Sequence, residues 1–132
     1  ASISPEQRPV IKSPDSAASL VMEELRYLDR ETFRIICLNT KNQVVKVDLI
    51  SQGILDSSLV HPREVFKTAI SRSAAALILV HNHPSGDPTP SEEDLKITRR
   101  LVEVGQLVGI EVLDHIIVGN NRYVSLKERG HM

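Results

Sequence analysis

A near-continuous apolar run from Ala75 to Val80 constrains the fold of this chain more than any other feature. Such a run is typical of a strand that is buried on both faces, because a half-exposed strand would alternate apolar and polar residues. It leads directly into the polar segment His81-Asn82-His83-Pro84-Ser85-Gly86, so the strand should end where a loop begins. A length of 132 residues is enough for one domain with a real core and too short for two comfortable ones.

Helical and extended patterns alternate along the rest of the chain. Ser13-Pro14-Asp15 is typical of a helix start, since serine caps a helix and proline suits its first turn. Apolar residues follow at steps of three and four, and this helix should end near Asp29-Arg30. The other expected elements are strands over 32–38 and 43–50, helices over 62–72 and from 91 to 109, and strands over 112–118 and 122–125. The sequence therefore predicts a mixed α/β domain with helices covering a largely β centre.

Composition narrows the classes of function. The hydrophobic fraction of 41% and the charged fraction of 25% are ordinary for a soluble globular domain. A net charge of -1, with two tyrosines, two phenylalanines and no tryptophan, disfavours a nucleic-acid surface. The longest apolar stretches, such as 74–80, fall well short of the ~20 residues that a membrane span needs. Cys37 is the only cysteine, so an internal disulfide is excluded and a reducing, cytoplasmic location is expected. Because the chain begins with Ala1, we expect a fragment or a processed product.

Two histidines stand where the buried strand should end. Residues two apart in an extended segment point to the same side, so the imidazoles of His81 and His83 can converge on one metal ion. His-x-His alone is a weak signal. Three prolines and a glycine stiffen the segment 84–90, however, and active sites favour loops that leave a rigid scaffold.

Asp94 is the candidate for a third ligand. Zinc accepts imidazole nitrogen and carboxylate oxygen, and three protein ligands leave a fourth position for water. A structural zinc site would have four ligands, usually including cysteines, so a metal here is expected to be catalytic. Ser91-Glu92-Glu93-Asp94 also fits a capping box at a helix start, and this structural interpretation competes with ligation unless Asp94 does both. The helix dipole accounts for Glu92 and Glu93.

The remaining candidates have simpler interpretations. His61 precedes a proline and is expected at the surface or as a cap, and His115 should be packed or hydrogen-bonded within its strand. Asp87 suits a turn, and Cys37 suits a small buried hydrophobe. His131 is terminal.

The spacing of these residues resembles a known signature. His81-x-His83, seven residues, Ser91, two residues and Asp94 match the JAMM (also JAB1/MPN) metalloproteases, whose signature is Glu, a variable gap, His-Ser/Thr-His, seven residues, Ser, two residues and Asp. The run His-Asn-His-Pro-Ser-Gly, followed by Pro90-Ser91, is similar to the RadC-like branch of that family. The resemblance extends from about residue 13 to residue 130.

The resemblance implies a role for each matched residue. It assigns three residues to one zinc ion: His81, His83 and Asp94. It assigns oxyanion support to Ser91, and its glutamate lies at the junction between the first helix and the next strand, which selects Glu31. Glu23 and Glu24 fall inside the expected helix, a turn or more too early. Asn82 departs from the wider signature, which has Ser or Thr, and as the middle residue it should point away from the metal.

The family also implies a fold. We expect a curved mixed β-sheet flanked by helices, an MPN/JAB domain similar to the cytidine-deaminase architecture, over residues 13–130 after a tail or linker of residues 1–12. RadC-like proteins often carry an upstream helix-hairpin-helix module, which is not seen in these residues. Nothing in the sequence supports the DNA-repair label that such proteins have long had.

These observations together predict a zinc-dependent hydrolase that cleaves an amide, peptide or isopeptide bond in a peptide or protein substrate. In this hypothesis zinc activates a water, Glu31 accepts and returns its proton, and Ser91 donates to the oxyanion. One rival is a non-catalytic interaction domain that keeps the fold. Another is a DNA-acting or repair-associated module, which the charge disfavours. A zinc deaminase would need paired cysteines, and the single cysteine cannot supply them.

Overall fold

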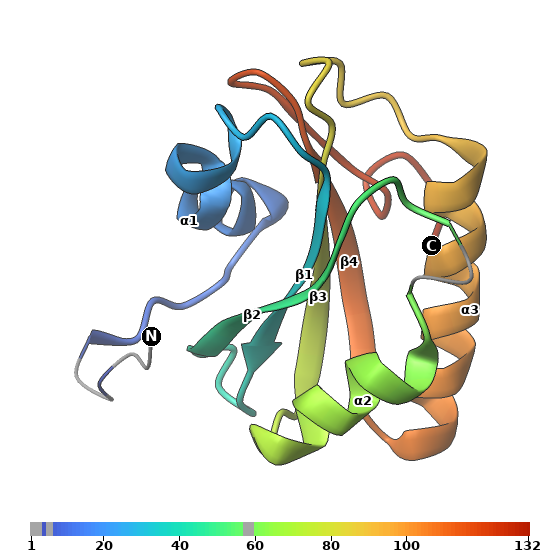
Figure 1. The fold of residues 1–132 in the computed structure, drawn as a ribbon. Coiled ribbons are helices and arrows are strands. Elements are labelled where there is room, and N and C mark those ends of the chain that lie inside the picture. Colours follow the sequence, from blue (N-terminus) through green and yellow to red (C-terminus); the bar gives the residue numbers. More distant parts are fainter. Residues whose placement is uncertain (1–3, 5–6, 57–59) are drawn as a thin grey trace.

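A five-stranded mixed sheet lies between helices in the computed structural model, which describes residue 4 and residues 7–56 and 60–132 (Figure 1). The elements are α1 (Pro14–Leu25), β1 (Thr32–Leu38), β2 (Val44–Gln52), α2 (Pro62–Ser71), β3 (Ala76–Asn82), α3 (Glu92–Val108), β4 (Glu111–Val118) and β5 (Tyr123–Ser125). The strand order is β2-β1-β3-β4-β5, with β3 and β4 parallel and the other neighbours antiparallel. This confirms the predicted mixed α/β architecture.

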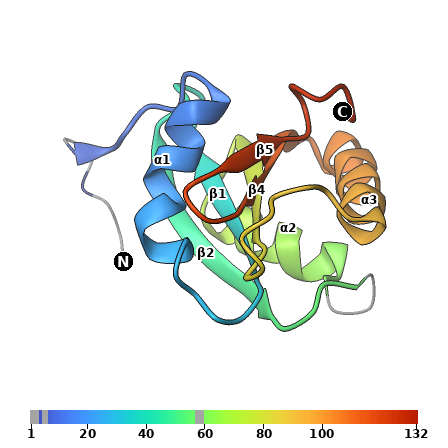
Figure 2. The ribbon, with the colours of Figure 1, turned by 90° about the horizontal axis from the view of Figure 1, so that it is seen from above.

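The two faces of the sheet carry different helices. Seen from above, α1 covers one face and α2 and α3 cover the other (Figure 2). Alternate residues of β3 divide between these layers: Ile78 and Val80 pack in the α1 cluster, whereas Leu77 and Leu79 pack under α2 and α3. Every residue of β3 is buried, as the apolar run predicted. The strand continues two residues further than expected and so includes His81.

Helix ends follow the expected caps with one exception. Ser13 caps α1 and Ser91 caps α3, each through a capping box, and α3 stops at Gly109, whose φ of 78° suits a residue without a side chain. The exception is the end of α1, which the sequence placed near Asp29-Arg30. The helix ends at Leu25 instead.

The expected tail makes contact with the sheet at its last residues. Val10 forms a bridge with Gln43, and the amide of Ile11 donates to the carbonyl of Asn42 at 2.8 Å. The Ile11 side chain is buried in the α1 cluster. The end of residues 1–12 therefore packs against the β1–β2 hairpin, while residues 1–3 and 5–6 lie outside the described part.

No helix in the described part of the chain has the length and apolar character that crossing a membrane requires.

Candidate metal centre

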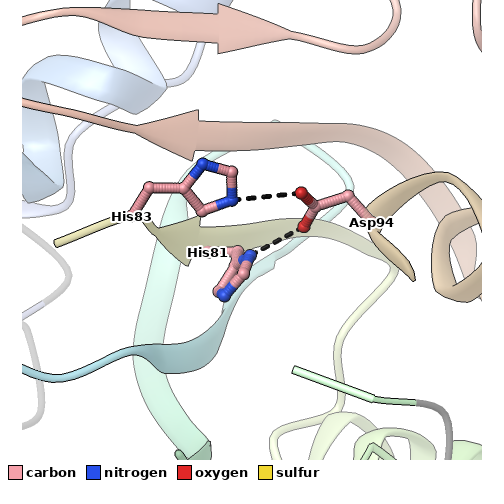
Figure 3. Close-up of side chains that lie close together, drawn as sticks. All are labelled: His81, His83 and Asp94. Atoms are coloured by element: carbon pink, nitrogen blue, oxygen red, sulfur yellow. Dashed lines mark hydrogen bonds and ion pairs between the residues drawn. The ribbon is translucent and has the colours of Figure 1, made fainter. Parts of the chain in front are cut away.

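Three side chains meet at the carboxyl end of β3 (Figure 3). His81 is the second-last residue of that strand, His83 follows the strand, and Asp94 lies in the first turn of α3. His81 Nδ1 is 2.7 Å from Asp94 Oδ1, and His83 Nε2 is 3.1 Å from Asp94 Oδ2. One potential ligand atom from each residue lies within 4.8 Å of the others. The structure thus brings together the three residues for which the sequence predicted a common site.

Asp94 is a fully buried carboxylate, with 0% of its surface exposed. Burial alone would raise the pKa of the Asp94 carboxyl, but hydrogen bonds with His81 and His83 outweigh it and hold the pKa well below its usual range. Oδ2 of Asp94 also accepts from the amide and the hydroxyl of Ser91, both at 2.8 Å. A negative charge is therefore fixed between the two imidazoles, which is the arrangement that a bound cation needs.

The ring orientation of His83 is set by its other nitrogen. Nδ1 lies 2.9 Å from the carbonyl oxygen of Asp87, which accepts only, so this nitrogen carries the hydrogen. Nε2 then faces Asp94 and is the atom left for a metal. The hydrogen bond with Asp94 raises the pKa of His83 most, burial opposes this effect, and the net shift is upward. A backbone carbonyl behind a histidine is the usual way in which a metal ligand is oriented.

The loop that carries His83 is fastened to the turn between β4 and β5. The amide of His83 donates to the carbonyl of Val118 at 2.8 Å, and the amide of Asn120 donates to the carbonyl of Gly86 at 2.9 Å. A Cβ added to Gly119 would lie 2.3 Å from the Gly86 oxygen, a distance that atoms cannot adopt. Glycine is required here by close approach to the Gly86 loop, a contact that the local sequence pattern does not reveal.

Glu31 reaches the same site from the connection between α1 and β1. Its Oε2 lies 3.2 Å from His81 Nε2 and accepts a hydrogen bond from the Leu55 amide at 3.0 Å. The two alternatives in the sequence, Glu23 and Glu24, instead pair with arginines beside α1, on the other face of the sheet. Of the three glutamates, the structure brings only Glu31 to the histidines.

Ser91 has a structural role and also lines the cleft at the site. Its hydroxyl accepts from the Asp94 amide at 3.1 Å and its backbone amide donates to Asp94 Oδ2 at 2.8 Å, so both parts of the capping box are formed. The hydroxyl also donates to Asp94 Oδ2. A cleft of about 330 Å³ opens beside it. The residues that line the cleft are Glu31, Ile54, Leu55, His81, His83, Pro84, Ser85, Ser91 and Glu93. The predicted catalytic and ligand side chains therefore border one cavity, apart from Asp94, which lies buried behind it.

The remaining candidates have the simpler roles that the sequence favoured. His61 caps α2 by accepting from the Arg63 amide at 3.1 Å. Asp87 forms a turn by accepting from the amide and hydroxyl of Thr89. Cys37 is buried, and burial raises the pKa of its thiol to about 12.

His115 is buried beneath the site rather than in it. Thr98 donates its hydroxyl hydrogen to the Asp94 carbonyl at 2.6 Å, so it accepts from Nδ1 of His115, also at 2.6 Å. Nε2 of His115 has no hydrogen-bond partner among the described residues. Burial lowers the pKa of His115 to about 3, so the ring is neutral and links β4 to the first turn of α3. The expectation that His115 is packed or hydrogen-bonded is confirmed, and its partner lies on α3.

The donor set fits a zinc ion. Two imidazole nitrogens and one carboxylate oxygen are the ligands of catalytic zinc sites that keep one position open. Among the described residues, no other group of three histidine, cysteine or acidic side chains is arranged in this way. The neighbouring carboxylate of Glu31 lies on the cleft side, where a group that handles protons is needed.

Comparison with known sequences agrees with this geometry. RadC-like JAB domains match residues 11–131, nearly the whole chain. The chain belongs to the RadC-like JAB domain family, whose wider membership includes metalloproteases. The family resemblance seen in the sequence is thereby confirmed.

Curated relatives share most of this chain's sequence. A UPF0758 protein of Desulfitobacterium hafniense (strain DSM 10664 / DCB-2) is 66% identical over 126 residues, covering 96% of this chain and 56% of that protein. The UPF0758 protein of Moorella thermoacetica is 65% identical over 122 residues, covering 92% and 53%. UPF0758 protein YsxA of Bacillus subtilis (strain 168) is 58% identical over 127 residues, covering 96% and 55%. The chain spans about half the length of these relatives, and their names state no activity.

Proposed function

We propose that this chain is a zinc-dependent hydrolase that cleaves an amide, peptide or isopeptide bond in a peptide or protein substrate. One observation carries the proposal: the buried Asp94 carboxylate faces both imidazoles, and a further carboxylate, Glu31, lies 3.2 Å from His81 at the edge of a cleft. Membership of a family that includes metalloproteases supports the hydrolase proposal.

His81, His83 and Asp94 would hold the zinc ion. When bound, zinc polarises a carbonyl group and lowers the pKa of a water molecule from about 16 to about 7. Contacts with other protein groups hold the ligands in place, since Ser91 donates to Asp94 and the Asp87 carbonyl orients His83. A preorganised site of this kind does not have to be assembled during the reaction.

Glu31 moves the proton in this scheme. Its carboxylate accepts the proton of the attacking water and returns it to the leaving amine, as a general base and then a general acid. The Leu55 amide donates to Oε2 of Glu31 at 3.0 Å and so fixes the carboxylate at the edge of the cleft. The side chain is 27% exposed, which leaves it accessible to a substrate in the cleft.

Ser91 supports the oxyanion. Its hydroxyl donates to Asp94 in this structure and borders the cleft. Turning the hydroxyl toward a substrate would supply one donor to the developing negative charge, and such donors contribute about 3 kcal/mol to the lowering of a barrier. The Ser91 amide, which donates to Asp94 Oδ2 at 2.8 Å, would still hold the carboxylate after the hydroxyl has turned.

The test separates metal binding from proton transfer. Glu31→Gln should keep its zinc, measured by elemental analysis, and lose cleavage of a peptide library. His83→Ala should lose the zinc itself, because one of three ligands is removed. Glu23→Gln is the matched control, since Glu23 is an exposed carboxylate on α1, and it should keep both properties. Full zinc content without cleavage of any peptide or isopeptide substrate by the wild-type protein would overturn the hydrolase and favour an interaction domain.

A further inference from the structure

Asn82 lies between the two histidines in sequence but serves another part of the site. It is the last residue of β3 and is 1% exposed. Its Oδ1 accepts from the amide and from the hydroxyl of Thr32, both at 2.7 Å. Its Nδ2 donates to the carbonyl of Arg30 at 2.9 Å. In the described part of the chain, the hydrogen bonds of this side chain therefore all go to residues 30–32, where β1 begins.

These contacts hold both peptide groups of Glu31. The Arg30 carbonyl belongs to the peptide bond before Glu31, and the Thr32 amide belongs to the peptide bond after it. The carbonyl of Glu31 itself accepts from the Gly53 amide at 3.0 Å. Glu31 lies outside the helices and strands, so these side-chain and loop contacts replace the ladder that would fix it within an element.

Asn82 takes over where the backbone pairing of β1 and β3 ends. The last residues paired between these strands are Phe33 and His81. Just beyond that pair, the side-chain amide of Asn82 bonds with Thr32 and Arg30, as a backbone peptide group would in a continuing ladder. The strand that carries His81 is therefore joined to the residues on either side of Glu31, which supplies the cleft carboxylate.

We infer that Asn82 is a positioning residue, which holds the backbone of Glu31 so that its carboxylate stays beside His81. The inference rests on the proposed function. The amide is suited to this task because it offers an acceptor and a donor, and it bonds on both sides of Glu31 at once. A serine or threonine, which the wider signature has at this position, has a single oxygen on a shorter side chain. That oxygen can donate and accept, but it cannot span the distance between Arg30 and Thr32 as the two separate amide atoms do.

The metal ligands do not depend on Asn82. His81 and His83 are held by hydrogen bonds with Asp94, the Asp87 carbonyl and the Val118 carbonyl, whereas the described hydrogen bonds of the Asn82 side chain go to Arg30 and Thr32. Loss of the amide should therefore loosen Glu31 without removing the zinc site. Since misplacement of a reacting group by about 1 Å can cost about 100-fold, we expect a fall in kcat of between about 10- and 100-fold.

The experiment uses two variants and three measurements. Asn82→Ser removes the amide that reaches Arg30 and Thr32. Asn82→Asp keeps the acceptor oxygen for Thr32 but sets a second oxygen, and a buried negative charge, against the Arg30 carbonyl. For each variant, zinc affinity, kcat and KM on the cleaved peptide, and hydrogen exchange at the Thr32 amide are measured on the zinc-loaded protein. Ser125→Ala is the control, because it removes a buried hydrogen bond, to Asp114, elsewhere in the sheet.

The expected result is a wild-type zinc affinity and a lowered kcat with little change in KM in both variants. Exchange at the Thr32 amide should be faster in Asn82→Ser than in Asn82→Asp, which keeps the acceptor oxygen. Ser125→Ala should lose stability with kcat unchanged. An unchanged kcat despite faster exchange, or a zinc affinity that falls together with kcat, would overturn the inference.

Failure of the proposed function is recognised separately. If the wild-type protein cleaves nothing, the hydrolase proposal fails, but NMR relaxation of the Glu31 side chain still decides whether Asn82 holds it. Greater mobility of that side chain in both Asn82 variants, but not in Ser125→Ala, would support positioning, and equal mobility in all of them would refute it.

Discussion

The starts of α1 and α3 are two versions of one local structure. Each helix opens with a serine N-cap whose hydroxyl accepts from the amide of the third helical residue. The side chain of that third residue in turn accepts from the backbone amide of the cap. In α1 the pair is Ser13 and Ser16, and in α3 it is Ser91 and Asp94. The pattern in the sequence marks a helix start in both places.

What differs is the surroundings of the third residue. Ser16 is partly accessible to solvent. Within the described part of the chain, its hydrogen-bond partners outside the helix ladder are Ser13, which is the cap, and Lys12, which precedes the cap. Asp94 is buried, and its carboxylate oxygens also lie 2.7 Å from His81 Nδ1 and 3.1 Å from His83 Nε2. The comparison teaches that capping is compatible with a place in a possible metal site, because one carboxylate bonds with the helix cap and faces both histidines.

Replacing Asp94 should have the largest effect. Asp94→Asn keeps an oxygen that can cap α3 but removes the charge, so we expect zinc affinity to fall by at least about 100-fold while the helix remains. Zinc titration with a competing chelator and circular dichroism measure the two quantities. Ser16→Ala changes the corresponding residue of α1 and should leave zinc affinity unchanged. Equal zinc affinity in wild type and Asp94→Asn would mean that Asp94 only caps.

A smaller effect is expected at the neighbouring cap residue. Ser91→Ala removes the hydroxyl that donates to Asp94 Oδ2, and loss of such a partner of a ligand typically weakens metal binding by about 10- to 100-fold. Because the Ser91 amide still donates to Asp94, we expect a value near the lower end. Zinc titration checks this. An affinity as low as that of Asp94→Asn would instead indicate that the carboxylate has moved.

The pH dependence of stability should also distinguish the two helices, since only α3 has a buried histidine behind it. The pKa of His115 is lowered to about 3 in the folded protein, below its value of about 6.5 in an unfolded chain. Below about pH 6.5 the unfolded chain takes up a proton that the native state refuses, so stability is lost as the pH falls toward 3.

His115→Phe removes this proton uptake. In urea unfolding of the zinc-free protein between about pH 6 and about pH 4, the wild type should lose up to about 1.4 kcal/mol per pH unit more than the variant. Parallel stability curves for the two proteins would show that the ring is protonated in the folded state. The cap of α1 contains no titrating group, and Ser16→Ala should follow the wild-type curve.

The smallest effect is expected at the exposed cap. Ser13→Ala removes the side chain that caps α1 and should lower the free energy of unfolding by about 1 kcal/mol, measured by urea unfolding. Zinc affinity should not change, because this cap touches no residue of the metal centre. A loss of zinc on this substitution would mean that the two helix starts are coupled through the sheet.

The sequence predicted the layers well because their signals are local. The apolar run of β3 and the cap and glycine of α3 each depend on a few neighbouring residues. The predicted end of α1 was wrong because helical spacing of apolar residues continues to Leu28. This residue packs in the α1 cluster from the turn that follows the helix. Spacing cannot distinguish a residue in a helix from one that reaches the same core from a turn.

The site was predictable only in part. His81, His83 and Asp94 are close in sequence, and their spacing matched a family signature. Glu31 lies 50 residues before His81, so only the resemblance could select it. The holding of Glu31 by Asn82 depends on which strands are neighbours, and that information is absent from the linear pattern.

The contact between Gly86 and Gly119 has a consequence for how the protein tolerates change. Position 119 is far along the chain from the histidines, yet any side chain there would collide with the loop that carries one of them. Substitutions or insertions in the turn between β4 and β5 should therefore lower metal affinity as much as some changes at the ligands themselves. A residue with no chemistry of its own would then be among the least replaceable in the domain.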